Sequence, residues 1–191
     1  KPAVMQAVLD LGADIINDIR ALGQPGAVEV VSRHPSCGIC LMHMHRDPLT
    51  MQVLPMQGDV VPSVRTFLSQ AAVRATSAGV AHERIVLDPG IGFGKTVAQN
   101  FSLMARQAEL LPEGFPLLVG WSRKSSLGAV TATQGLAPEA ASRLAASVAA
   151  AVLTADRGAA IVRVHDVLET VQALAVWGAM REQATPDSHV L

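Results

Sequence analysis

Five short apolar runs along the chain each stop at a cluster of polar and glycine residues. Each run has the length of a β-strand, and apolar residues at helical spacing follow it. This alternation predicts parallel strands covered by helices, with polar side chains converging at the carboxyl ends of the strands. The five clusters are Asn17-Asp18-Ile19-Arg20, His43-Met44-His45, Asp88 to Lys95, Ser122-Arg123-Lys124-Ser125 and Arg163-Val164-His165-Asp166.

The same pattern predicts where the elements lie. A first helix has an apolar stripe of Met5, Val8 and Leu9 and should end at Gly12. Strands are expected at 15–16, 39–44, 85–87, 117–120 and 161–164. Helices between them are expected from Pro25 through Val31, from Val64 to near Gly79, from Phe101 through Leu111 and from near Pro138 to Gly158.

The last two helices have predicted buried faces. Asp166 is expected to begin the final helix, with Glu169 three residues on as its capping-box partner. The buried residues are expected to be Leu144, Ala145, Val148, Ala151 and Val152 in the first of the two helices, and Val167, Val171, Leu174 and Ala175 in the second.

Strand–helix units of this kind fit an α/β fold, as either a doubly wound sheet or a barrel. The barrel is favoured because all five strands end in polar clusters, as a ring of loops around one mouth requires. A complete (β/α)8 TIM barrel needs about 250 residues. We therefore expect an incomplete barrel with about five of its eight units, truncated at the N-terminus, over residues 1–191, with a flexible tail at 184–191.

Composition narrows the class of protein. Half of the 191 residues are apolar, and 15 basic against 16 acidic residues leave a net charge of −1. This balance gives no support to nucleic-acid or anionic-membrane partners. No apolar run approaches the roughly 20 residues of a membrane span, so a soluble cytoplasmic protein is expected.

Cys37 and Cys40 form a C-x-x-C pair ahead of two histidines, which could be a zinc or redox site. However, strand alternation places Cys40 and His43 on opposite faces, and the chain has no second C-x-x-C to complete a structural zinc site. We therefore predict structural cysteines. His43 and His45 are expected to support the site rather than bind a ligand.

The glycine-rich stretch after Asp88 resembles a phosphate loop, but Pro89 stands where the first glycine would be required. The remaining signal is a carboxylate at a strand end, which offers two parallel acceptors to a guanidine-like heterocycle. Asn17 is expected to point inward at another strand end, with Asp18 capping locally or pairing with Arg20. Met42 could form an apolar wall for a planar ring or simply pack in the core.

Three basic side chains at two other strand ends predict an anion pocket. Arg163 and His165 share a face because residues two apart do so in a strand, and Lys124 follows the neighbouring strand. Together they suit a phosphate or pyrophosphate. For Arg123 an ion pair and a ligand contact both remain open.

Five stretches, in this order, resemble the dihydropteroate synthase family, the folate-pathway enzymes targeted by sulfonamides. They are Asn17 to Arg20, Leu41 to Met44, Asp88 to Lys95, the Gly120-Trp121-Ser122-Arg123-Lys124-Ser125 motif and Arg163 to Asp166. The resemblance implies a (β/α)8 barrel, usually a homodimer, that joins 4-aminobenzoate to a dihydropterin pyrophosphate. The implied roles are pterin binding by Asn17, Asp88, Met42, Lys124 and Arg163, aminobenzoate binding by Ser122 and Phe93, and diphosphate binding by Arg163 and His165. The residues expected to act in catalysis are Lys124, Arg163 and His165.

The family also uses Mg2+, whose ligand is expected in an N-terminal part that this chain lacks; no metal ligand is expected in the chain itself. The isolated 191 residues are accordingly expected to have little or no synthase activity. Two alternatives remain: a pterin-binding methyltransferase domain of the methyltetrahydrofolate type, and an inactive barrel fragment.

Overall fold

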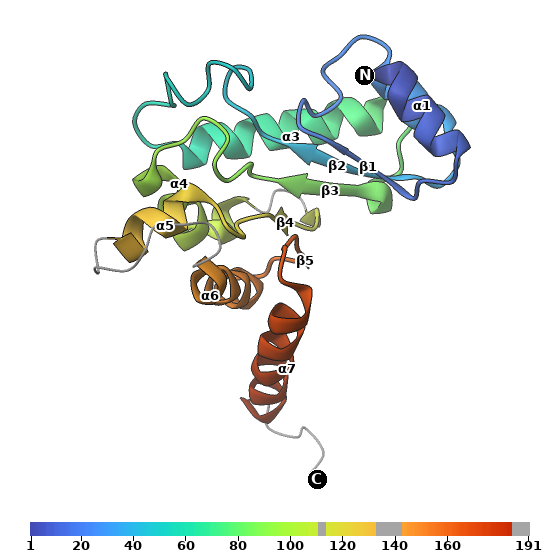
Figure 1. Cartoon of the computed structure of the whole chain (residues 1–191). Helices are drawn as coiled ribbons and strands as arrows, with labels where there is room; N and C mark the ends of the chain where they lie inside the picture. Colours follow the sequence, from blue (N-terminus) through green and yellow to red (C-terminus); the bar gives the residue numbers. More distant parts are fainter. Residues whose placement is uncertain (111–113, 133–142, 185–191) are drawn as a thin grey trace.

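Parallel strands form the centre of the molecule (Figure 1). The computed structural model describes residues 1–110, 114–132 and 143–184. All five predicted strands are present in this part of the chain. They are β1 (Ile15–Asp18), β2 (Gly38–Met42), β3 (Ile85–Asp88), β4 (Leu118–Val119) and β5 (Ile161–Val162).

The strands lie side by side in the order in which they occur in the chain. β1, β2 and β3 form one parallel sheet, and β4 and β5 form a second. A parallel bridge between Leu87 and Leu117 joins the two sheets. This sequential order differs from the reversal at the centre of a doubly wound sheet, so it supports the barrel-like arrangement of the α/β fold.

Seven α-helices and two short 3-10 helices connect or flank the strands in the described part of the chain (Figure 1). None of these helices is long and apolar enough to span a bilayer. The α-helices are α1 (Pro2–Asp10), α2 (Ala27–Arg33), α3 (Val61–Ser77), α4 (Val97–Ala105), α5 (Ser125–Ala132), α6 (Leu144–Asp156) and α7 (Val167–Ala184), and the 3-10 helices are η1 (His82–Arg84) and η2 (Gln107–Leu110).

Strand alternation divides the core into two parts. Ile39, Leu41 and Leu87 point toward the helices and belong to the main apolar cluster. The alternate residues Cys40, Val86 and Leu118 form a second, smaller cluster on the opposite face. At the two edges this second face is open, since Ile15 on β1 is 57% exposed and Ile161 on β5 is 41% exposed.

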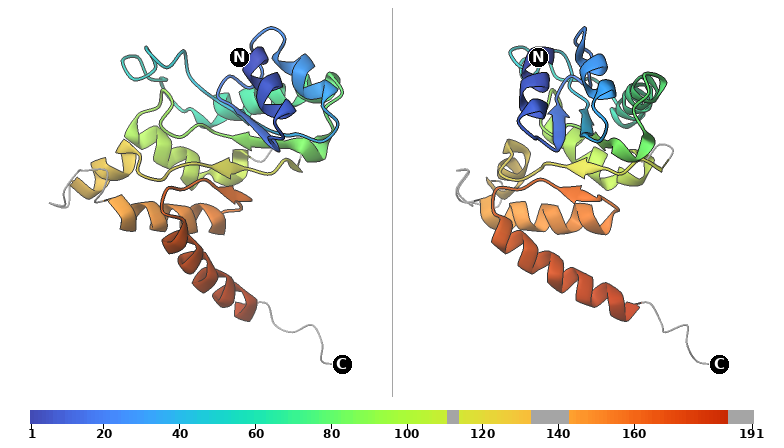
Figure 2. Two further views of the ribbon diagram at one scale, coloured as in Figure 1. Left: turned by 45° about the vertical axis from the view of Figure 1, so that its right-hand side comes forward. Right: turned by 90° about the vertical axis from the view of Figure 1, so that its right-hand side faces the viewer.

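The predicted stripe of α7 is wrong. Val167 and Val171 are exposed, and Thr170 is the buried residue of this helix. The reason is visible in Figure 2, where α7 extends away from the sheet and has little beside it except α6. A bond of 3.0 Å from the indole of Trp177 to Asp156 ties α7 to α6. The predicted tail at 184–191 begins one residue too early, because Ala184 is the last residue of α7, and residues 185–191 lie outside the described residues.

The predicted buried face of α6 is also largely wrong. Leu144 is exposed, and the helix buries a row of small and hydroxyl side chains instead. Ser147 explains part of this choice, because its hydroxyl accepts a 2.9 Å hydrogen bond from the backbone N–H of Arg123. The predicted start near Pro138 lies outside the described residues. The buried row is Ser147, Ala150, Ala151, Thr154 and Ala155.

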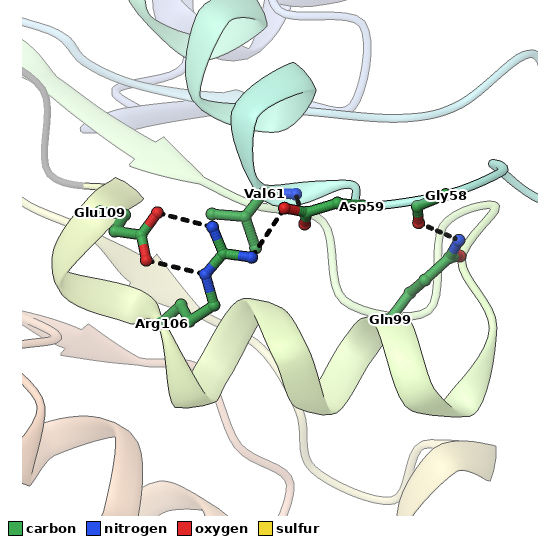
Figure 3. Close-up of polar contacts among 6 residues, drawn as sticks. All are labelled: Gly58, Asp59, Val61, Gln99, Arg106 and Glu109. Carbon is green, nitrogen blue, oxygen red and sulfur yellow. Dashed lines mark hydrogen bonds and ion pairs between the residues drawn. The ribbon is translucent and has the colours of Figure 1, made fainter.

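The predicted helix through Leu111 ends earlier, at Ala105, and η2 follows it. Arg106 stands at this break and bonds to Glu109 at 2.7 and 2.8 Å and to Asp59 at 2.8 Å (Figure 3). Figure 3 also shows Gln99 donating to the carbonyl of Gly58. These contacts join α4 to the segment before α3, on the outside of the molecule.

Candidate functional site at the carboxyl ends of the strands

The second face of the sheet leads directly to the candidate site. Each strand has an interior residue on this face. The next residue on the same face, two positions along the chain, lies at or just beyond the end of the strand. The sheet therefore gathers side chains from distant parts of the chain at one edge. In strand order these positions are Asn17, Met42, Asp88, Gly120 and Arg163.

Asp88 is the most buried charged group of this row, with 1% of its surface exposed. Its Oδ1 accepts a 2.7 Å hydrogen bond from the backbone N–H of Gly90. Its Oδ2 accepts none from the residues that the structure describes. Burial raises the pKa of this carboxyl, while the Gly90 bond and the charges of Lys124, Arg163 and Lys95 oppose the rise. A buried acceptor with one oxygen left over suits a ligand that brings its own N–H donors.

Lys124 reaches the same place from the loop after β4. Its ammonium donates to the carbonyl of Ile91 and lies 4.9 Å from the centre of the Phe93 ring. Burial lowers its pKa to about 8, an effect that Asp88 opposes. The side chain therefore remains mainly cationic at neutral pH, with its alkyl part against Gly92, where a Cβ would come within 3.1 Å of it.

Arg163 lies across β4 because Gly120 has no side chain. A Cβ on Gly120 would approach the Arg163 guanidinium to 2.6 Å. The sequence alone did not identify Gly120 as a site residue, although it stands directly before the Trp121-Ser122 pair of the motif. A glycine two residues beyond an interior Leu118 is the signal that could have indicated it.

Two contacts link the loop after β4 to the loop after β5. The hydroxyl of Ser122 lies 3.0 Å from Nδ1 of His165 and accepts from its backbone N–H at 3.3 Å. Arg123 forms an ion pair with Asp166 and donates to it through Nε at 3.2 Å. Of the two options for Arg123, the structure therefore has the ion pair. The Asp166 carboxylate is engaged by this guanidinium, and not in the predicted capping box.

The remaining predictions for this edge agree with the geometry. Asn17 pairs in register with Cys40 and so shares its inward face. Asp18 points the other way and accepts from the backbone N–H groups of Arg20 and Leu22 at 3.3 and 2.7 Å, which is local capping. Met42 pairs with Asp88 and is buried beside it.

Lys95 is a buried residue that sequence reasoning did not assign to the site. Its ammonium makes three hydrogen bonds, to Nδ1 of His43 and to the carbonyls of Gly90 and Phe93. His43 in turn packs edge-on against Phe67 of α3, on the helix side of β2 as predicted. Its pKa is lowered to about 3, first by burial and then by Lys95.

The cysteines do not form a joint site. Cys37 belongs to the main apolar cluster and Cys40 to the inner one, and both thiols are free and buried. Burial and the charge of Asp88 raise the pKa of Cys40 to about 12. Among the described residues, no three His, Cys, Asp or Glu side chains lie together as a metal site would require.

Comparison with protein families gives a match over residues 1–165 to the model described as "Pterin binding enzyme". The chain belongs to the pterin-binding enzyme family. A dihydropteroate synthase of Neisseria meningitidis serogroup B is 48% identical over 94% of this chain and 63% of its own length. The enzyme of Escherichia coli K12 is 46% identical over 92% and 60%. This family member thus spans about three fifths of the length of these curated relatives.

Solved structures of dihydropteroate synthases, which are TIM-barrel enzymes, have the same fold as this family member. The Burkholderia cenocepacia enzyme complexed with 7,8-dihydropteroate has a TM-score of 0.86 and 53% identity, covering 96% of this chain and 66% of the other. The Yersinia pestis enzyme in a sulfonamide drug complex has a TM-score of 0.88 and 42% identity, covering 96% and 65%.

Proposed function

We propose that this chain forms the pterin- and diphosphate-binding part of a dihydropteroate synthase. The reaction joins 4-aminobenzoate to 6-hydroxymethyl-7,8-dihydropterin diphosphate and yields 7,8-dihydropteroate and pyrophosphate. The fold behind this proposal is an α/β (β/α)8 barrel, of which the five strands would be five of eight units. The whole protein would be cytoplasmic and homodimeric and would use Mg2+, with small molecules as its substrates.

One observation carries the proposal: the buried Asp88 carboxylate faces the cationic groups of Lys124 and Arg163 at one edge of the sheet. The free carboxylate oxygen suits the amino and ring N–H groups of a pterin, and Asn17 adds amide groups from β1. Met42, buried beside Asp88, would contact the flat face of the ring. This end of the site would hold the heterocycle.

The cationic end would hold the diphosphate. Arg163 and His165 occupy one face of the chain beyond β5, and the guanidinium can bind two phosphate oxygens at once. When the bond between the methylene carbon and the diphosphate oxygen breaks, the oxygen leaves with the electron pair and gains negative charge. Cationic groups fixed in place beforehand stabilise that charge as it develops.

The aminobenzoate nitrogen would then form the new bond to the methylene carbon and lose a proton to solvent or buffer. Phe93 would contact its ring, and the Lys124 ammonium, 4.9 Å from the Phe93 centroid, would lie between the two substrates. Ser122 would act here too, although its hydroxyl lies against His165. We therefore expect its larger effect to be on the orientation of His165.

Pyrophosphate release by the whole protein tests this proposal, with both substrates, with each alone, and with a Lys124→Ala variant. We expect release to require both substrates and to fall at least tenfold in the variant. Calorimetry should show binding of the dihydropterin diphosphate. Binding of methyltetrahydrofolate with no binding of the diphosphate would support a methyltransferase domain instead, and binding with no turnover by the whole protein would support an inactive barrel.

A further inference from the structure

We infer that Lys95 is a positioning residue: it fixes the turn from Gly90 to Phe93 so that Phe93 and the Lys124 ammonium are held where the aminobenzoate must react. Lys95 is not among the residues implied by the family resemblance. The inference rests on the proposed function, since the aminobenzoate is part of that proposal.

The surroundings of the Lys95 ammonium provide one acceptor for each of its three N–H groups. Nζ lies 2.9 Å from Nδ1 of His43, 2.9 Å from the carbonyl of Gly90 and 3.1 Å from that of Phe93. The residue is only 5% exposed. A buried lysine with every donor used holds its partners in a defined arrangement, because releasing any of them would leave a buried polar group unpaired.

The turn needs such a tie because of its own sequence. Gly90, Gly92 and Gly94 all have positive φ, between 66° and 81°. Glycine permits this path but leaves it loosely defined, since it has more backbone freedom than any other residue. A Cβ at Gly94 would also come within 2.6 Å of the Cβ of His45, so the turn runs in close contact with the loop after β2. Lys95 binds this flexible turn to that loop through His43.

The front of the same turn carries the reactive groups. The Ile91 carbonyl, between the two carbonyls that Lys95 binds, accepts from Lys124, and the ring of Phe93 lies against that ammonium. Lys95 and Lys124 therefore bind different carbonyls of the same turn. A shift of the turn would move both Phe93 and Lys124. The hydrogen bond from the Gly90 N–H to Asp88 lies at the first residue of the turn, where it begins.

Two other side chains bind the turn, and one of them, Gln52, serves as the control. Gln52 donates to the carbonyl of Gly92 at 2.8 Å from an exposed loop, and the side-chain oxygen of Asn100 accepts from the backbone N–H of Gly92 at 2.8 Å. The Gln52 bond can exchange with water, so its loss should matter little. The Gln52→Leu variant thus removes a hydrogen bond to the same turn, but from an exposed side chain instead of a buried one.

The test uses the whole protein with Lys95→Met and Lys95→Ala, and Gln52→Leu as the control. We expect kcat/KM for aminobenzoate to fall about 100-fold in both Lys95 variants, as displacements near 1 Å do. The dissociation constant of the dihydropterin diphosphate should change less than about threefold, and Gln52→Leu should match the parent. Lys95→Ala removes three carbons and the nitrogen of the side chain, which n-propylamine can replace. Added n-propylamine should therefore raise kcat/KM of Lys95→Ala at least tenfold without raising its Tm.

Each contrary result has a distinct meaning. A parent protein without synthase turnover refutes the proposed function, whereas an active parent with equally active Lys95 variants refutes only this inference. If diphosphate binding, turnover and Tm all fall and the amine restores none of them, Lys95 has a purely structural role. That result would also refute this inference. If Met and Ala prevent folding, Lys95→Gln, which can still donate to the two carbonyls, gives the same comparison of the two substrates.

Discussion

The two ends of the candidate site differ most in their access to water. At the end of β3, only 1% of the surface of Asp88 is exposed, and its neighbours are buried. At the end of β5, Arg163 and His165 are exposed, and the edge of the sheet beside them is open. A dry end and a wet end thus share one row of strand-end positions, separated by the glycine at position 120.

This difference decides what each end can do. A buried hydrogen bond to a charged group is worth about 1.5–3 kcal/mol, and an unmet partner there costs a similar amount. Exposed charges interact through water and are screened by salt. The dry end is therefore suited to selecting a heterocycle by its pattern of donors, and the wet end to attracting a diphosphate by charge.

The largest effect is expected from Asp88→Asn at the dry end. The amide replaces one acceptor oxygen with a donor, which would face the N–H groups of the pterin. We expect the dissociation constant of the dihydropterin diphosphate to rise about 100-fold, as measured by calorimetry. Asp18→Asn is the matched control, because Asp18 also ends a strand but caps a local turn. Equal effects of the two variants would contradict the assignment of Asp88.

A smaller effect is expected from Arg163→Ala at the wet end. Affinity for the diphosphate substrate should fall about tenfold, whereas affinity for the hydroxymethyl pterin, which lacks the diphosphate, should fall less. The parent's binding of the diphosphate should weaken with added salt, and the variant's should weaken less. A variant that loses affinity for both pterins alike would show that Arg163 acts on the ring and that the two ends are not separate.

The buried lysines should make stability depend on pH. Burial lowers the pKa of Lys95 to about 7 and that of Lys124 to about 8, against 10.5 in the unfolded chain. Between pH 7 and 9 the unfolded chain therefore binds more protons, and this contribution to stability rises with pH. The free energy of unfolding in urea, measured for the parent relative to Lys95→Met, should therefore be larger at pH 9 than at pH 7. An equal difference at pH 7 and pH 9 would contradict the lowered pKa.

The sequence predicted the strands and the strand-end residues well because both follow from local pattern. Alternation alone separated Asn17 from Asp18 and Cys40 from His43, and the registers agree. The buried face of α7 could not be predicted in this way, because a stripe such as Val167 and Val171 is buried only where another element packs on it, and among the described elements α7 contacts mainly α6. Lys95 and Gly120 were missed for a related reason: their meaning depends on His43 and Arg163, which are distant in the sequence.

The smallest effect is expected from the ion pair between Arg123 and Asp166, which links the loops at the wet end. The Arg123 side chain is 42% exposed, and exposed pairs contribute about 0.2–1 kcal/mol. Asp166→Asn should therefore lower the free energy of unfolding by less than about 1 kcal/mol, and salt should reduce the difference. A double-mutant cycle with Arg123→Gln isolates the pair from the other contacts of each residue. A coupling energy above about 2 kcal/mol would mean that this link is shielded from water, and the contrast between a dry and a wet end would then be limited to Arg163 and His165.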